Sequence, residues 1–123
     1  MAFTATNIIP LQRTVQTTAV AVLRGTRLTM NTSGLCAASA IGVRGDYIAV
    51  QDIAASSYGL AAPTAAGGSI AVIASENTTL GAAAYSAASG LTSVTATNAV
   101  LMGKWKTATA ANTLGIIELE SVA

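Results

Sequence analysis

The chain has 123 residues, a formal net charge of +1, no histidine and one cysteine. Only 9% of its residues are charged, against about 25% in ordinary soluble domains, and its Lys and Arg residues are scattered rather than clustered as in nucleic-acid binders. The missing histidine removes the commonest general base and metal ligand, so we expect a non-enzymatic protein with no cofactor and no bound nucleic acid.

Residues 1–12 have no helical period and are predicted to form an extended N-terminal arm. Pro10 favours an extended conformation at the residue before it. The apolar residues on which this interpretation depends are Phe3, Ile8, Ile9 and Leu11. An arm that is free in solvent gains nothing from them, whereas an arm that adds a strand to an exposed sheet edge buries them. The edge can belong to a neighbouring molecule or to the chain's own domain.

Short strands are predicted after the arm. β-branched residues favour a strand over residues 14–24, with Val20 and Val22 on one face. Further strands are expected over residues 27–31 and 47–51. Gly-rich turns separate them.

Residues 52–59 are the best candidate for a short helix. Asp52 suits the N-cap, and Gly59 suits the position that follows a helix. The strand predicted over residues 69–75 is apolar on both faces, which places it in the centre of a sheet or at an interface.

The last two strands have the clearest periodicity. In residues 115–122, Ile117 and Leu119 alternate with glutamates, as expected for a half-buried strand. In residues 98–106, Leu101 and Trp105 are predicted to face the core, with the two lysines on the other face. Trp105 is the only tryptophan, so we expect it to anchor the core.

About eight short strands with Gly-rich turns are typical of a small β-sandwich or barrel. We therefore predict an all-β fold with at most one short helix, organised as the arm over residues 1–12 and a single β domain over residues 13–123. Alanine is the commonest apolar residue and buries little area. The core should be thin, and other subunits are expected to add burial.

No membrane partner is expected. The start of the sequence has no basic region followed by an apolar one, as a secretory signal requires. The two long uncharged segments, residues 53–75 and 77–103, are interrupted by Gly and polar residues and do not read as membrane spans.

No catalytic or metal site is predicted. Glu118 and Glu120 share a strand face about 7 Å apart, but a paired-carboxylate glycosidase also needs a cleft lined by aromatic residues, and aromatic residues are only 4% of the chain. A solvated strand face explains the pair better. Cys36 lies among small apolar residues and is interpreted as a buried residue. Arg44-Gly45-Asp46 matches the tripeptide of integrin ligands, but matches of three residues occur by chance, and a tight turn with Gly between two polar residues explains it without a receptor.

The order of several short motifs resembles the capsid cement, or head decoration, proteins of tailed bacteriophages. These motifs cover residues 40–120: Gly42-Val-Arg-Gly-Asp-Tyr47 with Gln51-Asp52-Ile53, Gly81-Ala-Ala-Ala-Tyr85, Leu101-Met-Gly103, and Asn112-Thr-Leu-Gly115 with Ile117-Glu-Leu119. Family members often have an acidic residue where this chain has Ala82. The resemblance does not include the first third of the chain.

The resemblance implies a structural virion protein on the outer surface of an icosahedral capsid, assembled in the host cytoplasm. It implies binding to the major capsid protein at junctions between its subunits. Because the arm is apolar, we expect its residues Phe3, Ile8, Ile9 and Leu11 to be the capsid contacts. A homo-oligomer is expected, with a trimer favoured by threefold junctions and a dimer as the alternative. The alternative function is a receptor-binding or adhesive head-fibre module that presents Arg44-Gly45-Asp46 or a Thr-rich face.

Overall fold

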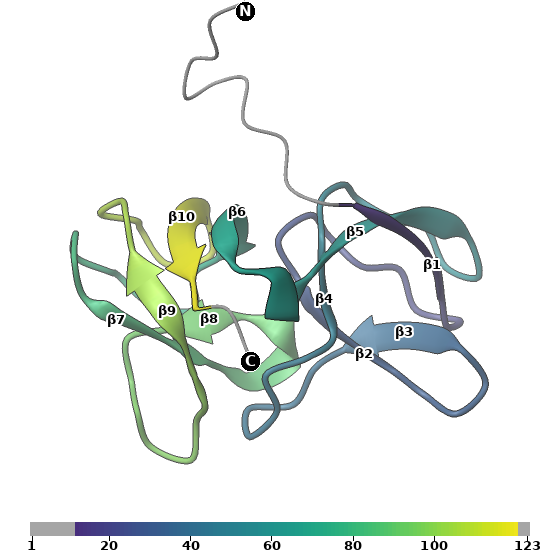
Figure 1. The fold of residues 1–123 in the computed structure, drawn as a ribbon, viewed down its shortest axis with the longest axis horizontal. Helices are drawn as coiled ribbons and strands as arrows, with labels where there is room; N and C mark the ends of the chain where they lie inside the picture. Colours follow the sequence, from purple (N-terminus) through teal and green to yellow (C-terminus); the bar gives the residue numbers. More distant parts are fainter. Residues whose placement is uncertain (1–11, 121–123) are drawn as a thin grey trace, which may run out of the picture.

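The computed structural model describes residues 12–120, and this part of the chain is all-β, as predicted. Its strands form two halves that lie side by side, a barrel and a curled sheet (Figure 1). No α-helix occurs in the described residues, and the two helical turns are short 3-10 segments, η2 (Thr64–Ala66) and η3 (Ala88–Gly90). Residues 12–120 form ten strands, two more than the approximate number expected.

The barrel forms the N-terminal half and is closed, in the spatial order β1–β3–β2–β4–β5. Its strands are β1 (Arg13–Thr17), β2 (Arg27–Met30), β3 (Leu35–Ala38), β4 (Tyr47–Ala49) and β5 (Tyr58–Pro63). Closure comes from antiparallel pairing of β1 with β5 and parallel pairing of β1 with β3. A closed barrel has no free edge strand.

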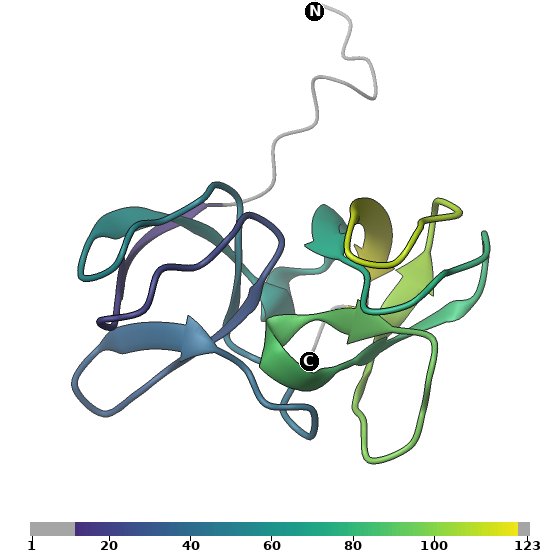
Figure 2. The same cartoon turned by 180° about the vertical axis from the view of Figure 1, so that it is seen from behind.

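The second half is a five-stranded sheet in the order β6–β10–β9–β7–β8. Its strands are β6 (Gly68–Ile73), β7 (Ala83–Ser86), β8 (Thr92–Ser93), β9 (Leu101–Trp105) and β10 (Leu114–Leu119). The sheet curls until Ala74, just after β6, forms a bridge with Thr92 on β8. The turn η2 connects β5 to β6 where the two halves meet, as the opposite view also shows (Figure 2).

The core is continuous between the halves. Trp105 is 1% exposed and its indole N–H donates to the carbonyl of Ser93 at 3.1 Å, so its predicted role as a core anchor is confirmed. The cluster around Trp105 includes Ile48 from β4 and Ala62 from β5. A second cluster fills the barrel: Val15, Val22, Leu28, Cys36, Ala49, Ile53 and Ala61. Cys36 is buried, as expected, and burial followed by the nearby charge of Asp46 raises the pKa of its thiol.

A fully buried arginine also joins the two halves. Arg27 is 0% exposed, and its Nε donates to the carbonyl of Leu91 at 2.9 Å. Its Nη atoms donate to the carbonyls of two loops: Ala40, Val43, Arg44 and Ala87. Burial lowers the pKa of Arg27 to about 10. Because the guanidinium stays charged at neutral pH, these carbonyls replace the water that it loses.

The predicted orientation of Leu101 is wrong, and a β-bulge is the reason. Ala84 pairs with Gly103 and Tyr85 pairs with Leu101, so Met102 is one extra residue in β9. Met102 is therefore buried, whereas Leu101 is 39% exposed. The rest of the strand keeps the predicted alternation.

The helix predicted over residues 52–59 is also wrong. Ile53 forms an antiparallel bridge with Val22, with backbone hydrogen bonds of 2.9 Å in both directions. The Asp52 carboxylate accepts a bond from the backbone N–H of Arg24 at 2.8 Å instead of capping a helix. β1 ends at Thr17, so Val20 is exposed and Val22 is buried, contrary to the prediction that they share a face.

Candidate interaction surface

The predicted contact residues of the arm, Phe3, Ile8, Ile9 and Leu11, lie outside the described residues. The candidate surface is therefore described for residues 12–120, where five features bear on function. These are the Arg-Gly-Asp turn, a polar cluster on the sheet, exposed apolar side chains, an open pocket and the free edge of β6.

The Arg-Gly-Asp turn is used within the fold. The guanidinium of Arg44 donates to the carbonyls of Leu101 at 3.2 Å and Thr64 at 3.1 Å, and also to that of Glu120. Burial lowers the pKa of Arg44, and the charge of Glu120 opposes this effect.

The other two residues of the turn are also engaged. The Asp46 carboxylate accepts a bond from the backbone N–H of Met30 at 2.9 Å. Gly45 has a φ of +89°, a conformation that other residues rarely adopt. The turn interpretation therefore accounts for this sequence, and its arginine connects the barrel to the ends of β9 and β10.

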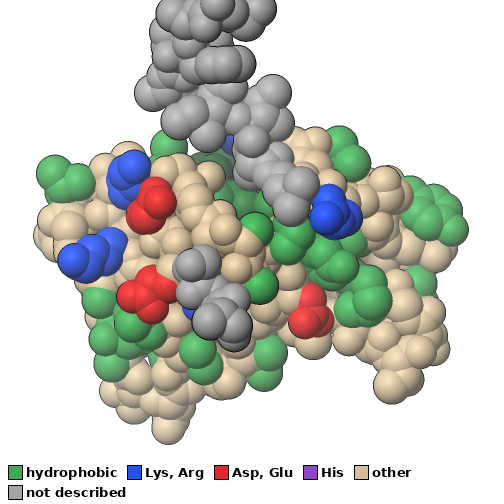
Figure 3. All heavy atoms as spheres, in the orientation of Figure 1, with side chains coloured by type: hydrophobic (Ala, Val, Ile, Leu, Met, Phe, Trp, Pro, Cys, Tyr) green, Lys and Arg blue, Asp and Glu red, His purple; other side chains and the backbone are tan. Residues whose placement is uncertain are grey.

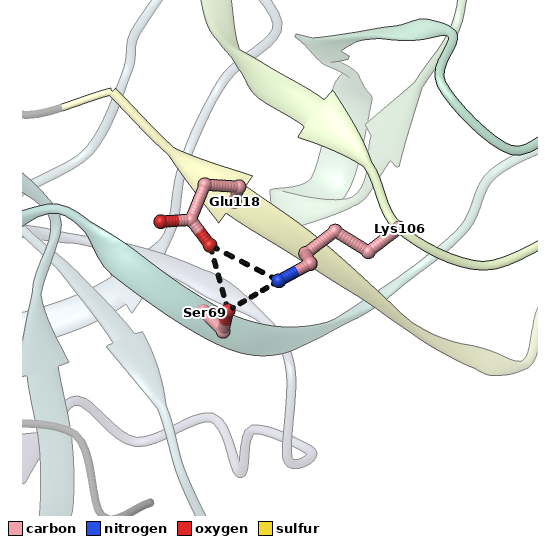
Figure 4. Close-up of polar contacts among 3 residues, drawn as sticks. All are labelled: Ser69, Lys106 and Glu118. Carbon is pink, nitrogen blue, oxygen red and sulfur yellow. Dashed lines mark hydrogen bonds and ion pairs between the residues drawn. The ribbon is translucent and has the colours of Figure 1, made fainter. Parts of the chain in front are cut away.

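A polar cluster on the outer face of the sheet links three strands (Figure 4). Ser69 on β6 donates to the Glu118 carboxylate on β10 at 2.7 Å. Lys106, just after β9, donates to the Ser69 hydroxyl at 3.3 Å and forms an ion pair with Glu118 at 3.6 Å. The Ser69 hydrogen bond and then Lys106 lower the pKa of Glu118, although desolvation opposes them.

This arrangement cross-links strands at an exposed surface, where such ion pairs add little stability. About half of the side-chain surface of both charged partners is exposed. Glu118 and Glu120 share the exposed face, as predicted. Among the described residues, no group of three or more His, Cys, Asp or Glu side chains is placed to hold a metal ion.

Exposed apolar side chains form the second feature of the sheet face. Leu114 and Ile116 on β10 are 45% and 42% exposed, beside Ile73 and Ala71 on β6. The loop between β1 and β2 lies against this face, because a Cβ placed on Gly25 would be 2.6 Å from the Leu114 side chain. Elsewhere the large exposed apolar side chains are Val20, Leu23, Met30, Ile41, Val43, Tyr58, Leu60, Leu80 and Leu101.

Apolar side chains also gather along the middle of one face, where the barrel meets the sheet (Figure 3). An open pocket of about 570 Å³ lies near the start of β1, and its lining combines opposite charges with apolar and amide side chains: Arg13, Met30, Asn31, Asp46, Tyr47 and Pro63. The surface thus offers apolar contacts with few charges.

No helix within residues 12–120 is long and apolar enough to cross a membrane.

Most of this surface was not expected from the sequence. β6 is an edge strand of its sheet, so of the two predicted positions the centre of a sheet is wrong and the interface alternative is left. A signal for the exposed apolar face was present in β10, where Leu114 and Ile116 alternate with the buried Gly115 and Ile117. The first half of β10 therefore has apolar residues on its exposed face as well as on its buried face. The glutamates in the second half favoured the interpretation of that face as polar.

No protein-family model matches the sequence, and no curated protein matches it. Among solved structures, the fold is similar to the N base of the head fibre protein gp8.5 of bacteriophage phi29, with a TM-score of 0.71 and 16% sequence identity. The match covers 89% of this chain and 93% of that one. The chain therefore shares its all-β fold with the base of a bacteriophage head fibre.

Proposed function

We propose that this chain is a non-enzymatic structural protein of a bacteriophage head, attached to the outer surface of the capsid as the base of a fibre. One observation carries the proposal, the structural similarity over 93% of the head-fibre base. The proposed partner is the major capsid protein, and the location is the virion, after assembly in the host cytoplasm.

The surface chemistry supports an assembly role. The protein has 9% charged residues and many exposed apolar side chains. Covering this apolar surface with a partner therefore lowers the free energy of the system. We propose that the arm residues Phe3, Ile8, Ile9 and Leu11 contact the capsid. A homo-oligomer, with a trimer favoured and a dimer as the alternative, adds avidity from repeated weak contacts.

A capsid cement protein is the second candidate function. The sequence motifs over residues 40–120 favour it, because their order resembles that of head decoration proteins. The two functions share the location and the partner, and they differ in whether the protein strengthens the shell. An adhesive role through Arg44-Gly45-Asp46 has less support, because the arginine is bonded within the fold.

Head attachment is tested by mixing purified protein with expanded shells that lack it and measuring retention by sedimentation. The proposal predicts saturable retention. A well-folded protein that stays in the supernatant at all concentrations contradicts it.

The melting temperature of the loaded shells separates the two candidates. A fibre base is expected to raise the shell's melting temperature only slightly, through the mass action of binding, whereas a cement protein raises it markedly. Shells with an unrelated protein of similar size serve as the control for non-specific protection.

A further inference from the structure

The outer edge of β6 has unpaired backbone groups. The carbonyl of Ile116 accepts a bond from the N–H of Lys106 at 2.7 Å, and the N–H of Glu120 donates to Met102 at 3.0 Å. Even-numbered residues of β10 are thus directed toward β9, and odd-numbered ones toward β6.

The pairing register then fixes the direction of each backbone group in β6. Val72 and Ile70 pair with odd-numbered residues of β10, so their N–H and C=O groups point toward β10. Ser69, Ala71 and Ile73 point theirs the other way, because the groups alternate along a strand.

Part of this outer edge is already covered. The N–H of Ile73 donates to the carbonyl of Gly25 at 3.2 Å, and the N–H of Ser75 donates to Thr92 at 2.9 Å. Within residues 12–120, the backbone groups of Ser69 and Ala71 have no partner.

The length of the N-terminal segment and the place where it joins β1 suit this edge. Arg13, the first residue of β1, pairs with Ala61 close to the end of β5, and β5 leads through η2 into β6. Eleven residues in an extended conformation span roughly 36 Å, which is ample for a three-residue edge. Tethering also gives the segment a high effective concentration at an edge of its own domain.

The side-chain pattern fits a strand as well. In an extended conformation, Phe3, Ile9 and Leu11 lie on one face and Ile8 on the other. We propose that residues 2–11 of the same chain pair with the outer edge of β6 and bond to Ser69 and Ala71. In the free protein the added strand buries one apolar face and leaves Ile8 exposed, so contact of all four side chains with the capsid requires the arm to leave this edge on the shell. The inference therefore goes beyond the proposed function.

Hydrogen exchange of individual backbone amides, measured by NMR on the free protein, tests the inference. The full chain is compared with a variant that lacks residues 2–11. The Ala71 amide should exchange at least about tenfold more slowly in the full chain than in the variant. The amides of Ile70 and Val72 face β10 and should exchange equally in both proteins, which also verifies that the variant is folded.

A second variant retains the arm and alters the edge. Ala71→Pro removes the outward N–H, a change that an edge strand tolerates. It should accelerate exchange at Ser69 to the rate of the deletion variant, with Val72 again as the control.

Two results overturn the inference. Equal exchange of the Ala71 amide in the full chain and the deletion variant means that the arm does not cover the edge. If the Ala71 amide loses its protection from exchange on dilution, and light scattering gives a mass larger than that of one chain, a second copy of the chain covers the edge. Both readouts come from the protein without shells, so a failure of head binding is a separate outcome.

Discussion

Arg27 is a charged residue that this small fold removes wholly from solvent. Its hydrogen-bond partners are backbone carbonyls of the loops on either side of the junction between the halves. Removal of the side chain takes the donor from the carbonyls of Val43, Arg44 and Ala87, whereas those of Leu91 and Ala40 keep a backbone N–H. Each polar group left buried and unpaired costs about 1–3 kcal/mol. The residue therefore acts as a connector between loops.

Arg27→Met should lower the free energy of unfolding by about 3 kcal/mol or more. Urea unfolding followed by the fluorescence of Trp105 measures it. Arg13→Met is the matched control, because Arg13 is exposed and, among residues 12–120, its guanidinium donates only to the neighbouring carbonyl of Gln12. It should change stability by less than about 0.5 kcal/mol. Equal stability of the two variants would show that the buried guanidinium is dispensable.

The ion pair of Glu118 predicts a small dependence of stability on pH. The pKa of Glu118 is lowered in the fold from 4.5 by its bonds to Ser69 and Lys106, so its stabilising contribution is present above pH 4.5 and is lost as the pH falls through the folded value. The difference in urea midpoint between the wild type and Glu118→Gln should therefore shrink between pH 7 and pH 3. A difference that stays constant over this range contradicts the assignment. Arg27 adds no pH dependence at neutral pH, because its pKa remains about 10.

At the scale of elements, local patterns predicted some strands well and others poorly. The alternation in β10 and the burial of Trp105 follow from side-chain period alone, since a half-buried strand must alternate. The bulge at Met102 could not be predicted, because it arises from pairing with β7. The residues at 52–59 carry helix-capping residue types, but the bridge between Val22 and Ile53 decides their conformation.

Gly103, beside the bulge in β9, is predicted not to tolerate a side chain. A Cβ at this position would lie 1.8 Å from the carbonyl oxygen of Glu118 on β10, and backbone atoms of a paired strand cannot move aside cheaply. Gly103→Ala should lower the free energy of unfolding by more than about 2 kcal/mol. Gly42→Ala is the control, because its Cβ would meet only the carbonyl of Asn98 at 3.7 Å. An unchanged denaturation midpoint for Gly103→Ala would refute the close approach of β9 and β10.

At the scale of the whole molecule, the all-β class followed from the sequence, but the division into barrel and sheet did not. β6 pairs with β10, about forty residues later in the chain, and β1 pairs in parallel with β3. No local period encodes such distant pairings. The edge position of β6 could not be predicted for the same reason. A strand lies at an edge when no other strand pairs with one of its sides, and local sequence does not encode this.

The arm is the part of the molecule whose removal should separate folding from attachment. A variant without residues 2–11 should keep its cooperative unfolding, because residues 13–123 are predicted to form the β domain. It should bind expanded shells at least about tenfold more weakly, because the apolar contacts of Phe3, Ile8, Ile9 and Leu11 are lost. Binding isotherms from sedimentation give the ratio, and unchanged affinity would remove the arm from the capsid contact.

Electron cryo-microscopy of bacteriophage heads with and without bound protein tests the central claim most directly. The account predicts additional density on the outer surface of the shell, into which the barrel and the curled sheet fit as two adjoining lobes. Identical density in the two samples, at protein concentrations well above those used for sedimentation, would contradict a role on the capsid exterior.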